Sequence, residues 1–428
     1  MVEPAESLLP FMGKDRVRYA LIPTVNDIGA DDIAVCVNRS AGQHPIPKDS
    51  FDAGEEARCR VRRFHETLPG FRVTPLVRLR GLSHRLGLAD LRVKDEAGRL
   101  NLNAFKILGA SYAAAVVLTE MLELSKGAPS LEALTAQGSA LNAFTLITAT
   151  DGNHGRAVAW VARAVGCRAR IYIPGQTSDA RSNAITGLGA EVIRVDGNYD
   201  DAVLRAATSA SEAGGILIQD TAWEGYERIP KLIMQGYMTL LSEIRDQWPG
   251  EGPTHVFAQA GVGSLAASLS LLLRQGLFER RPRLIIVETD QAACFYQGVN
   301  GGSDSPERIE GALDSIMAGL ACGEANPIAW DILRSGGDGF VCCSDRVAIS
   351  GMRLLGRPLD GDSSIVSGES GAVTAGLLNQ LMLNPLFEKE RKDLALDQDA
   401  RVLLISTEGE TDPGFYRETV ARPASIEL

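Results

Sequence analysis

Short apolar runs alternate with amphipathic stretches through the middle of the chain. Apolar, β-branched runs predict strands over residues 144–150, 168–173, 191–195 and 215–220. Apolar positions at helical spacing predict helices over residues 156–165, 179–188 and 199–213. Strands that alternate with helices of this length are typical of βαβ units, so we expect a parallel sheet here.

A second run of the same kind lies towards the C-terminus. It predicts strands over residues 254–260, 284–288 and 401–406, and a helix after the first of them. Residues 298–370 are rich in glycine and less regular, and residues 1 to about 65 show little periodicity. The pattern therefore predicts an α/β chain with two parallel-sheet lobes.

The composition is that of an ordinary globular protein. The chain has 428 residues, of which 45% are hydrophobic, so it can bury a large core. Its 54 acidic and 43 basic residues give a net charge of −11, which argues against a nucleic-acid partner. The seven cysteines form no CxxC pair and no two of the five histidines lie three or four residues apart, so no metal site is indicated.

The sequence also bears on localisation. The first residues lack the apolar core of a secretory signal. The longest apolar stretch, residues 261–273, is too short and too rich in serine to span a bilayer. We therefore expect a cytoplasmic protein with no membrane partner.

A glycine-rich turn follows the predicted strand at 254–260. Gly261, Gly263 and Ser264 can close backbone and hydroxyl donors on a phosphate at the start of a helix. Gly261, Gly263 and Ala266 also fit G-x-G-x-x-A, and Glu288 ends the next predicted strand, as in a dinucleotide fingerprint. From this turn alone, a single phosphate and a nicotinamide dinucleotide are nearly tied.

The turn after residues 144–150 reads Asp-Gly-Asn-His-Gly, residues 151–155. Asp151 lies where it could act as a base, and Asn153 can donate a hydrogen bond to an oxygen. The N–H groups of the turn can hold a carboxylate. Taken alone, Asp151 is better explained as a helix N-cap, and His154 as a packing residue.

Lys106 lies among apolar residues in Asn-Ala-Phe-Lys-Ile-Leu-Gly, residues 103–109, just before a predicted helix over 110–118. A lysine in a site of low polarity near a phosphate can form a Schiff base. For any single lysine, however, a surface position with a buried stem is the more common explanation.

Along the chain the order is Lys106, then the turn at 151–155, then the glycine-rich turn at 261–264. Together and in that order, these motifs resemble those of the fold type II pyridoxal-phosphate enzymes. Within that group the chain looks like the diaminopropionate ammonia-lyases over about residues 60 to 415. The most specific parts are Asp151 in its turn and the block Gln-Asp-Thr-Ala-Trp-Glu-Gly-Tyr at 219–226. Ser406, where Asn is expected, and Glu410, where Asp is expected, depart from the pattern.

The resemblance implies a tryptophan synthase β-like architecture with the cofactor, pyridoxal 5′-phosphate, in the cleft between two domains. Residues 1–115 and 240–428 would form the large domain, and residues 116–239 the small one. It also implies a homodimer. A disulfide between Cys294 and Cys322 is not expected.

The resemblance also assigns roles to single residues. Lys106 would hold the cofactor as a Schiff base, and Asn153 would donate to its phenolic oxygen. Thr407, or less favourably Ser406, would face the pyridine nitrogen. The phosphate would be bound by five consecutive residues, Gly261, Val262, Gly263, Ser264 and Leu265.

The implied substrate is 2,3-diaminopropionate, D or L, converted to pyruvate and two ammonia. Asp151, Gly152 and His154 would bind it. Asp151 and Asp220 would attract its β-ammonium, which serine lacks. Lys106 would be the base for one enantiomer and Asp151 for the other.

Three alternatives stay open. A serine or threonine dehydratase-type enzyme would not need Asp151 or the 219–226 block. A non-catalytic pyridoxal-phosphate-binding homologue would not need the complete set of Lys106, Asn153 and the phosphate turn. A nicotinamide enzyme is more distant, since it gives no reason for Lys106 or Asn153.

Overall fold

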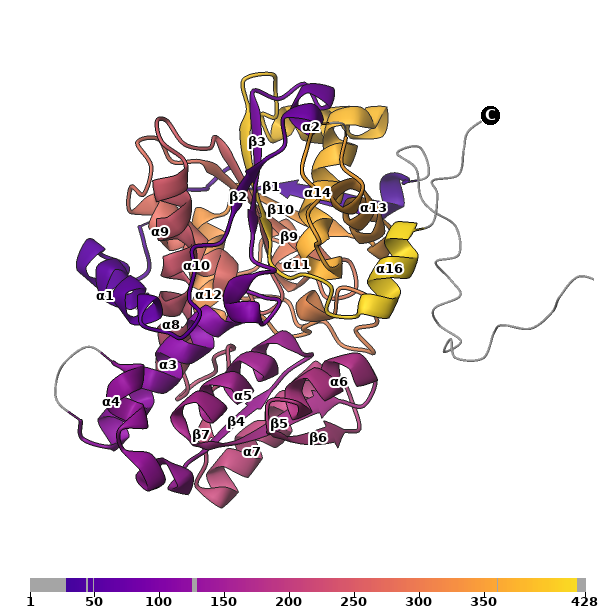
Figure 1. The fold of residues 1–428 in the computed structure, drawn as a ribbon. Coiled ribbons are helices and arrows are strands. Elements are labelled where there is room, and N and C mark those ends of the chain that lie inside the picture. Colours follow the sequence, from indigo (N-terminus) through magenta and orange to yellow (C-terminus); the bar gives the residue numbers. More distant parts are fainter. Residues whose placement is uncertain (1–27, 44, 49, 125–128, 360, 422–428) are drawn as a thin grey trace, which may run out of the picture.

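A computed structural model describes residues 28–421 apart from residues 44, 49, 125–128 and 360. The predictions for residues 1–27 and 422–428 lie outside this part. The chain forms two lobes, each built on one sheet (Figure 1). The larger sheet has the order β1-β10-β9-β8-β11-β3-β2 and the smaller β6-β5-β4-β7.

The larger sheet has seven strands. Its strands are β1 (Ile33–Val37), β2 (Leu76–Arg78), β3 (Asp90–Asp95), β8 (His255–Gln259), β9 (Arg283–Thr289), β10 (Gly339–Cys343) and β11 (Arg401–Ser406). The five central strands are parallel, as expected. The edge strands β1 and β2 run antiparallel to β10 and β3, which the sequence did not indicate.

Helices cover both faces of the larger sheet. Successive side chains of a strand point to opposite faces, so Leu284 and Ile286 of β9 pack in one cluster and Ile285 and Val287 in another. The first cluster includes α9 (Met238–Gln247), α10 (Ser264–Arg274) and α12 (Pro327–Gly336). The second includes α13 (Asp345–Gly356) and α14 (Glu369–Leu383).

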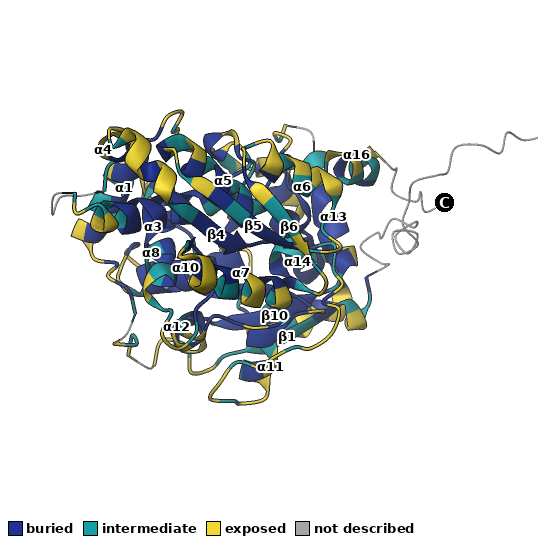
Figure 2. Ribbon diagram, turned by 90° about the horizontal axis from the view of Figure 1, so that it is seen from below, coloured by how far each residue is buried: buried dark blue, intermediate teal, exposed yellow. Residues whose placement is uncertain are grey.

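The smaller sheet is parallel throughout. Its strands are β4 (Thr145–Ala149), β5 (Arg168–Pro174), β6 (Glu191–Val195) and β7 (Ile216–Leu217). Helix α5 (Asn153–Val165) packs on the face with Leu146 and Ile171, and α7 (Tyr199–Ala213) on the face with Ile147 and Tyr172. In Figure 2 the inner strand β4 is mostly buried, whereas the edge strand β6 has no buried residue.

The remaining helices join the lobes or cover their surfaces. They are α1 (Glu55–Glu66), α2 (Arg80–Arg85), α3 (Lys106–Met121), α4 (Leu131–Thr135), α6 (Asp179–Thr186), α8 (Arg228–Gly236), α11 (Cys294–Asn300), α15 (Glu388–Asp393) and α16 (Pro413–Ala421). Helix α8 packs against both α3 and α10. The strands of the small sheet all fall within 116–239, but the domain boundaries themselves stay a prediction.

Residues 298–370, which the sequence predicted to be less regular, contain regular elements that it did not predict. That region contains α12, β10 and α13. Gly336 ends α12, Gly337 follows it and Gly339 begins β10, and these glycines interrupt the apolar pattern there. Conversely, only Ile216–Leu217 of the predicted strand 215–220 pair with a neighbour.

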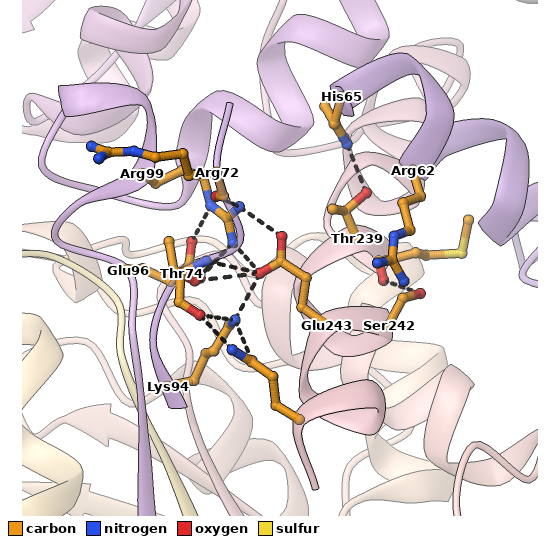
Figure 3. A network of polar contacts seen from close by, with 12 residues as sticks. Arg62, His65, Arg72, Thr74, Lys94, Glu96, Arg99, Thr239, Ser242 and Glu243 are labelled. Carbon is orange, nitrogen blue, oxygen red and sulfur yellow. Dashed lines mark hydrogen bonds and ion pairs between the residues drawn. The ribbon is translucent and has the colours of Figure 1, made fainter. Parts of the chain in front are cut away.

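A buried network of charged residues fixes the segment that precedes Lys106 (Figure 3). Glu243 of α9 accepts from Lys94 Nζ and from Arg99 Nη2, each at 2.7 Å. Arg99 also donates to Glu96 at 2.8 Å, and all four side chains have no exposed surface. Two cations against two carboxylates leave no charge uncompensated, which buried ions require.

Candidate functional site

An inner cavity lies where the carboxyl ends of strands from both sheets meet. Strands β4 and β7 approach it from the small lobe, and β8 and β11 from the large lobe. Ligands bind at this edge of parallel sheets. The lining residues are Phe105, Lys106, Thr150, Asp151, Asn153, His154, Tyr199, Asp220, Gln259, Gly261, Val262, Gly263, Ser264, Leu265, Gly319, Leu320, Cys322, Ser370, Thr407 and Glu408.

The structure thus brings together all but one of the predicted site residues. Gly152 does not line the cavity. The cavity measures about 50 Å³. That is below the roughly 300–1,000 Å³ of typical ligand pockets.

Lys106 and Asp220 form an ion pair inside this cavity. Lys106 is the first residue of α3, and its Nζ lies 2.5 Å from Asp220 Oδ2. Burial opposes the charged form of each group, but their mutual attraction outweighs it. The pKa of Lys106 is therefore raised and the pKa of Asp220 is lowered. Both groups are charged at neutral pH.

Asp220 accepts hydrogen bonds from Tyr199 and, at 3.3 Å, from Gln219 Nε2, and His154 lies beside it. Tyr199 Oη donates to Asp220 Oδ1 at 3.2 Å, and His154 Nδ1 lies 3.9 Å from Oδ2. His154 Nε2 lies 2.7 Å from the carbonyl oxygen of Ile218, so it must carry the proton. Burial lowers the pKa of His154, and its neutral ring leaves Nδ1 without a partner beside the carboxylate.

Asp151 is not a helix cap. The N-cap of α5 is Gly152, and no side chain caps that end. Among the described residues the Asp151 carboxylate has no hydrogen-bond or ion-pair partner, although it lines the cavity. The N–H of Gly152 is donated to Thr150 Oγ1 at 2.8 Å. Binding of substrate by Gly152 stays a prediction that this contact does not favour.

Asn153 begins α5, and its side chain points across to the large lobe. Its Nδ2 donates to Glu408 Oε2 at 2.5 Å. Glu408 was not among the predicted site residues. It follows β11 at a strand end, which is the position where polar side chains gather at a parallel sheet.

The turn Gly261–Leu265 leads from β8 into α10, which begins at Ser264. A Cβ on Gly261 would lie 2.7 Å from the Gly319 carbonyl oxygen. Gly263 has φ +91°, and a Cβ there would lie 2.3 Å from the Phe295 ring. Both glycines are therefore required by close packing of the turn itself.

The dinucleotide fingerprint is not supported. Glu288 does not reach the cavity, because its carboxylate accepts the N–H groups of Phe295 and Tyr296 at 2.9 and 2.7 Å, at the start of α11. Burial raises the pKa of Glu288 to about 8. This carboxyl group is a helix cap and is not free to bind a ribose.

Thr407 and Ser406 differ in their surroundings. Thr407 lines the cavity, whereas Ser406 Oγ lies outside the lining and donates to Ser367 Oγ at 2.8 Å. The structure is therefore consistent with the preference for Thr407. Cys294 and Cys322 are both free and buried, and Cys322 lines the cavity.

We expect Gly261→Ala to weaken cofactor binding while the fold survives. The added methyl group meets backbone at Gly319, so the turn must shift by several tenths of an ångström. A titration of the apoprotein with pyridoxal phosphate should show a dissociation constant raised by at least about tenfold. This corresponds to a loss of about 1.4 kcal/mol of binding free energy. Circular dichroism should be unchanged. Unaltered affinity would place the phosphate elsewhere.

An outer cavity of about 590 Å³ adjoins the inner one and shares Asp151 and Tyr199 with it. It is markedly acidic. Its ionisable lining residues are Asp151, Asp290, Asp314, Asp345, Glu369 and Asp412 against Arg181 and Arg346. Burial raises the pKa of Glu369 to about 7, so the other five carry most of the negative charge. A cavity lined by one sign of charge concentrates ligands of the opposite sign. This arrangement favours a cationic ligand on its way to Lys106.

Several lining residues were missed from the sequence. They are Phe105, Thr150, Tyr199, Gln259, Gly319, Leu320, Cys322, Ser370 and Glu408. Most adjoin a predicted strand end or motif, so the strand-end rule gave a signal for them. Gly319, Leu320, Cys322 and Ser370 belong to the less regular region at 298–370, where no strand end was predicted.

Neither a metal-binding cluster nor a membrane-spanning helix is present among the described residues. In this part of the chain no cluster of three or more histidine, cysteine or acidic residues could hold a metal ion. Nor does any helix within 28–421, outside the gaps given above, have the length and apolar character needed to cross a membrane.

Comparison with known proteins gives a consistent result. The family model of the pyridoxal-phosphate dependent enzymes matches residues 67–408. Diaminopropionate ammonia-lyase of Escherichia coli strain K12 is 46% identical over 363 residues, covering 84% of this chain and 90% of that protein. The Salmonella typhimurium enzyme is 44% identical over 366 residues, and the match covers 84% of this chain and 91% of that protein.

Solved structures agree. Diaminopropionate ammonia lyase from Escherichia coli in complex with D-serine has a TM-score of 0.83 and 43% identity, covering 91% of this chain and 96% of that one. The same enzyme in complex with an aminoacrylate-PLP azomethine reaction intermediate has a TM-score of 0.81 and 42% identity, with the same coverage. The chain therefore belongs to the pyridoxal-phosphate dependent enzymes of fold type II, and among them to the diaminopropionate ammonia-lyase family.

Proposed function

We propose that this protein converts 2,3-diaminopropionate, in both D and L forms, to pyruvate and two ammonia. The overall reaction takes up one water, which supplies the oxygen of the keto group. The observation that carries the proposal is the placement of Lys106, Asp151 and Asp220 on one cavity. One amine and two carboxylates of the protein therefore face the same cavity. They complement a substrate that has two amines and one carboxylate.

The residues of the inner cavity suit pyridoxal phosphate. The N-terminus of α10 and the Gly261–Leu265 turn would hold the phosphate, since a helix N-terminus attracts anions. Lys106 would bond covalently to the aldehyde carbon of the cofactor. Asn153 would donate a hydrogen bond to its phenolic oxygen, and Thr407 would face its pyridine nitrogen. Ser370 Oγ also lines the cavity, is buried, and has no hydrogen-bond partner among the described residues.

When bound, the cofactor withdraws electrons from the α-carbon of the substrate and so makes its α-proton acidic. Lys106 lines only the inner cavity, whereas Asp151 lines both. Two bases at different positions suit a substrate that presents its α-proton on either side. Each would take that proton from one enantiomer.

Asp220 would hold the leaving amine. Its carboxylate already binds one primary ammonium, that of Lys106, and its lowered pKa keeps it charged. A base must be neutral, and a neutral Lys106 amine no longer forms an ion pair with Asp220. Asp220 then becomes available for the β-ammonium of the substrate. A charge-assisted hydrogen bond of this kind distinguishes diaminopropionate from serine, whose hydroxyl is neutral.

The acidic outer cavity supports the same preference. Five aspartates against two arginines favour a substrate with an extra amine over serine or threonine. A homodimer and a cytoplasmic location, both expected from the sequence, stay predictions.

The test is an assay of ammonia and pyruvate released from both enantiomers of diaminopropionate, with serine and threonine as controls. We expect two ammonia for each pyruvate from diaminopropionate and a lower kcat/KM for serine and threonine. A higher kcat/KM for serine or threonine would favour the dehydratase-type alternative. Bound cofactor without turnover of any of the four would favour the non-catalytic one.

A further inference from the structure

Glu408 connects three parts of the site. It follows β11 and is only 2% exposed. Its backbone pairs with Ala104, two residues before Lys106, and its carbonyl oxygen accepts the N–H of Gly368 at 3.0 Å. Its side chain lines the inner cavity. Glu408 therefore touches the lysine-bearing segment and the segment that begins α14.

The carboxylate of Glu408 is held by donors on both oxygens. Oε1 accepts the N–H of Ser370, in the first turn of α14, at 3.0 Å. The positive end of the helix dipole stabilises a carboxylate there. Oε2 accepts from Asn153 Nδ2 at 2.5 Å, so Glu408 of the large lobe holds a side chain of the small lobe.

This contact fixes which way the Asn153 amide faces. An ionised carboxylate can only accept hydrogen bonds, so Asn153 must present its NH₂ group to Glu408 and not its oxygen. That group has two hydrogens. One is used by Glu408, and the other remains available on a side chain that lines the cavity.

We propose that Glu408 is a positioning residue that orients Asn153, so that the second Asn153 N–H is directed to the phenolic oxygen of the cofactor. The proposal rests on the role of Asn153 given above and not on the identity of the substrate. It can therefore be tested on the holoenzyme without any substrate, and it can fail while the proposed reaction stands.

The decisive variant is Glu408→Gln. The N–H of Ser370 would still donate to the amide oxygen of the new glutamine side chain. The NH₂ group of that glutamine would then face the NH₂ group of Asn153. Asn153 must then turn its oxygen to this neighbour, and its donor leaves the cofactor. We expect the visible absorption band of the bound cofactor, and the pH at which that band titrates, to shift as they do in Asn153→Ala.

A double variant separates this role from a direct effect of the lost charge. If Glu408 acts through Asn153, then Glu408→Gln combined with Asn153→Ala should shift the band and its titration no further than Asn153→Ala alone. Additive shifts would show that Glu408 acts on the cofactor independently, and would overturn the proposal. So would a wild-type spectrum in Glu408→Gln.

Two further variants complete the test. Glu410→Gln removes the same charge two residues away, outside the cavity lining, and should leave the spectrum unchanged. A shift there equal to that of Glu408→Gln would also overturn the proposal. If Glu408→Gln does not fold, Glu408→Asp keeps the charge but shortens the side chain by one methylene. It should then produce the same spectral shift, and an unshifted band would contradict the proposal.

Discussion

Lys106→Ala is expected to lose turnover with every substrate, by a factor of at least about 10⁴. A single positioned proton-transfer group contributes about 10² to 10⁴. Lys106 is expected to act both as the covalent anchor of the cofactor and as the base for one enantiomer. The loss of activity on its removal should therefore be at least about 10⁴, the upper end of that range. The measurement is kcat/KM for ammonia release from each enantiomer.

A chemical label tests the same residue independently of turnover. The purified holoenzyme should be yellow, and borohydride should bleach the visible band. Digestion after reduction should then place the pyridoxyl group on Lys106. The matched control is Lys389→Ala, whose side chain is 80% exposed on α15 and which should keep both turnover and label. A label on any other lysine would refute the assignment of the cofactor site.

Asp151→Asn is expected to lose activity selectively, by a factor on the order of 10² to 10⁴ for one enantiomer, the usual contribution of a positioned general base. We expect the D form to be affected, because Lys106 is expected to serve the L form. The substitution keeps shape and hydrogen bonding but removes the base. The other enantiomer should lose much less, since Asp151 also adds to the negative charge of the outer cavity.

The control is Asp290→Asn, which removes an exposed carboxylate from the same outer cavity and should change both enantiomers little and equally. Equal, large losses in Asp151→Asn would mean that Asp151 binds substrate and is not the enantiomer-selective base. Full activity on both forms would leave Asp151 without a role in the reaction.

The structure changes what Asp220→Asn can show. From the sequence, a residue that only attracts the β-ammonium should affect both enantiomers to a similar degree. Asp220 also lies 2.5 Å from Lys106 Nζ and raises the pKa of that amine. Its loss should therefore disturb the lysine as well, and the effect on the L form should be the larger one.

The sequence by itself determined much of the local structure. Strands at 191–195 and 401–406 and the helix at 199–213 have the predicted bounds. Each is marked by an apolar pattern of one period and by flanking turn residues, which are properties of neighbouring residues in the chain. The rule that ligands bind at the carboxyl ends of parallel strands then placed most of the site on the correct turns.

Other features were visible only in the tertiary structure. The Lys106–Asp220 pair joins residues 114 positions apart, and Asn153–Glu408 joins residues 255 apart. Such pairs depend on the order of strands in each sheet and on how the two lobes face each other. A period-two pattern shows which residues of a strand are buried but not which strand lies beside it.

The same limit explains the elements that were missed and the nucleotide alternative that one turn left open. The strand β10 and its flanking helices α12 and α13 were missed because glycines required by packing interrupt their local pattern. Glu288 fitted a nucleotide fingerprint by spacing alone, yet its carboxylate is used up by two backbone N–H groups of α11. Spacing determines where a side chain can lie, and only its partners in the folded chain decide whether it is free to bind a ligand.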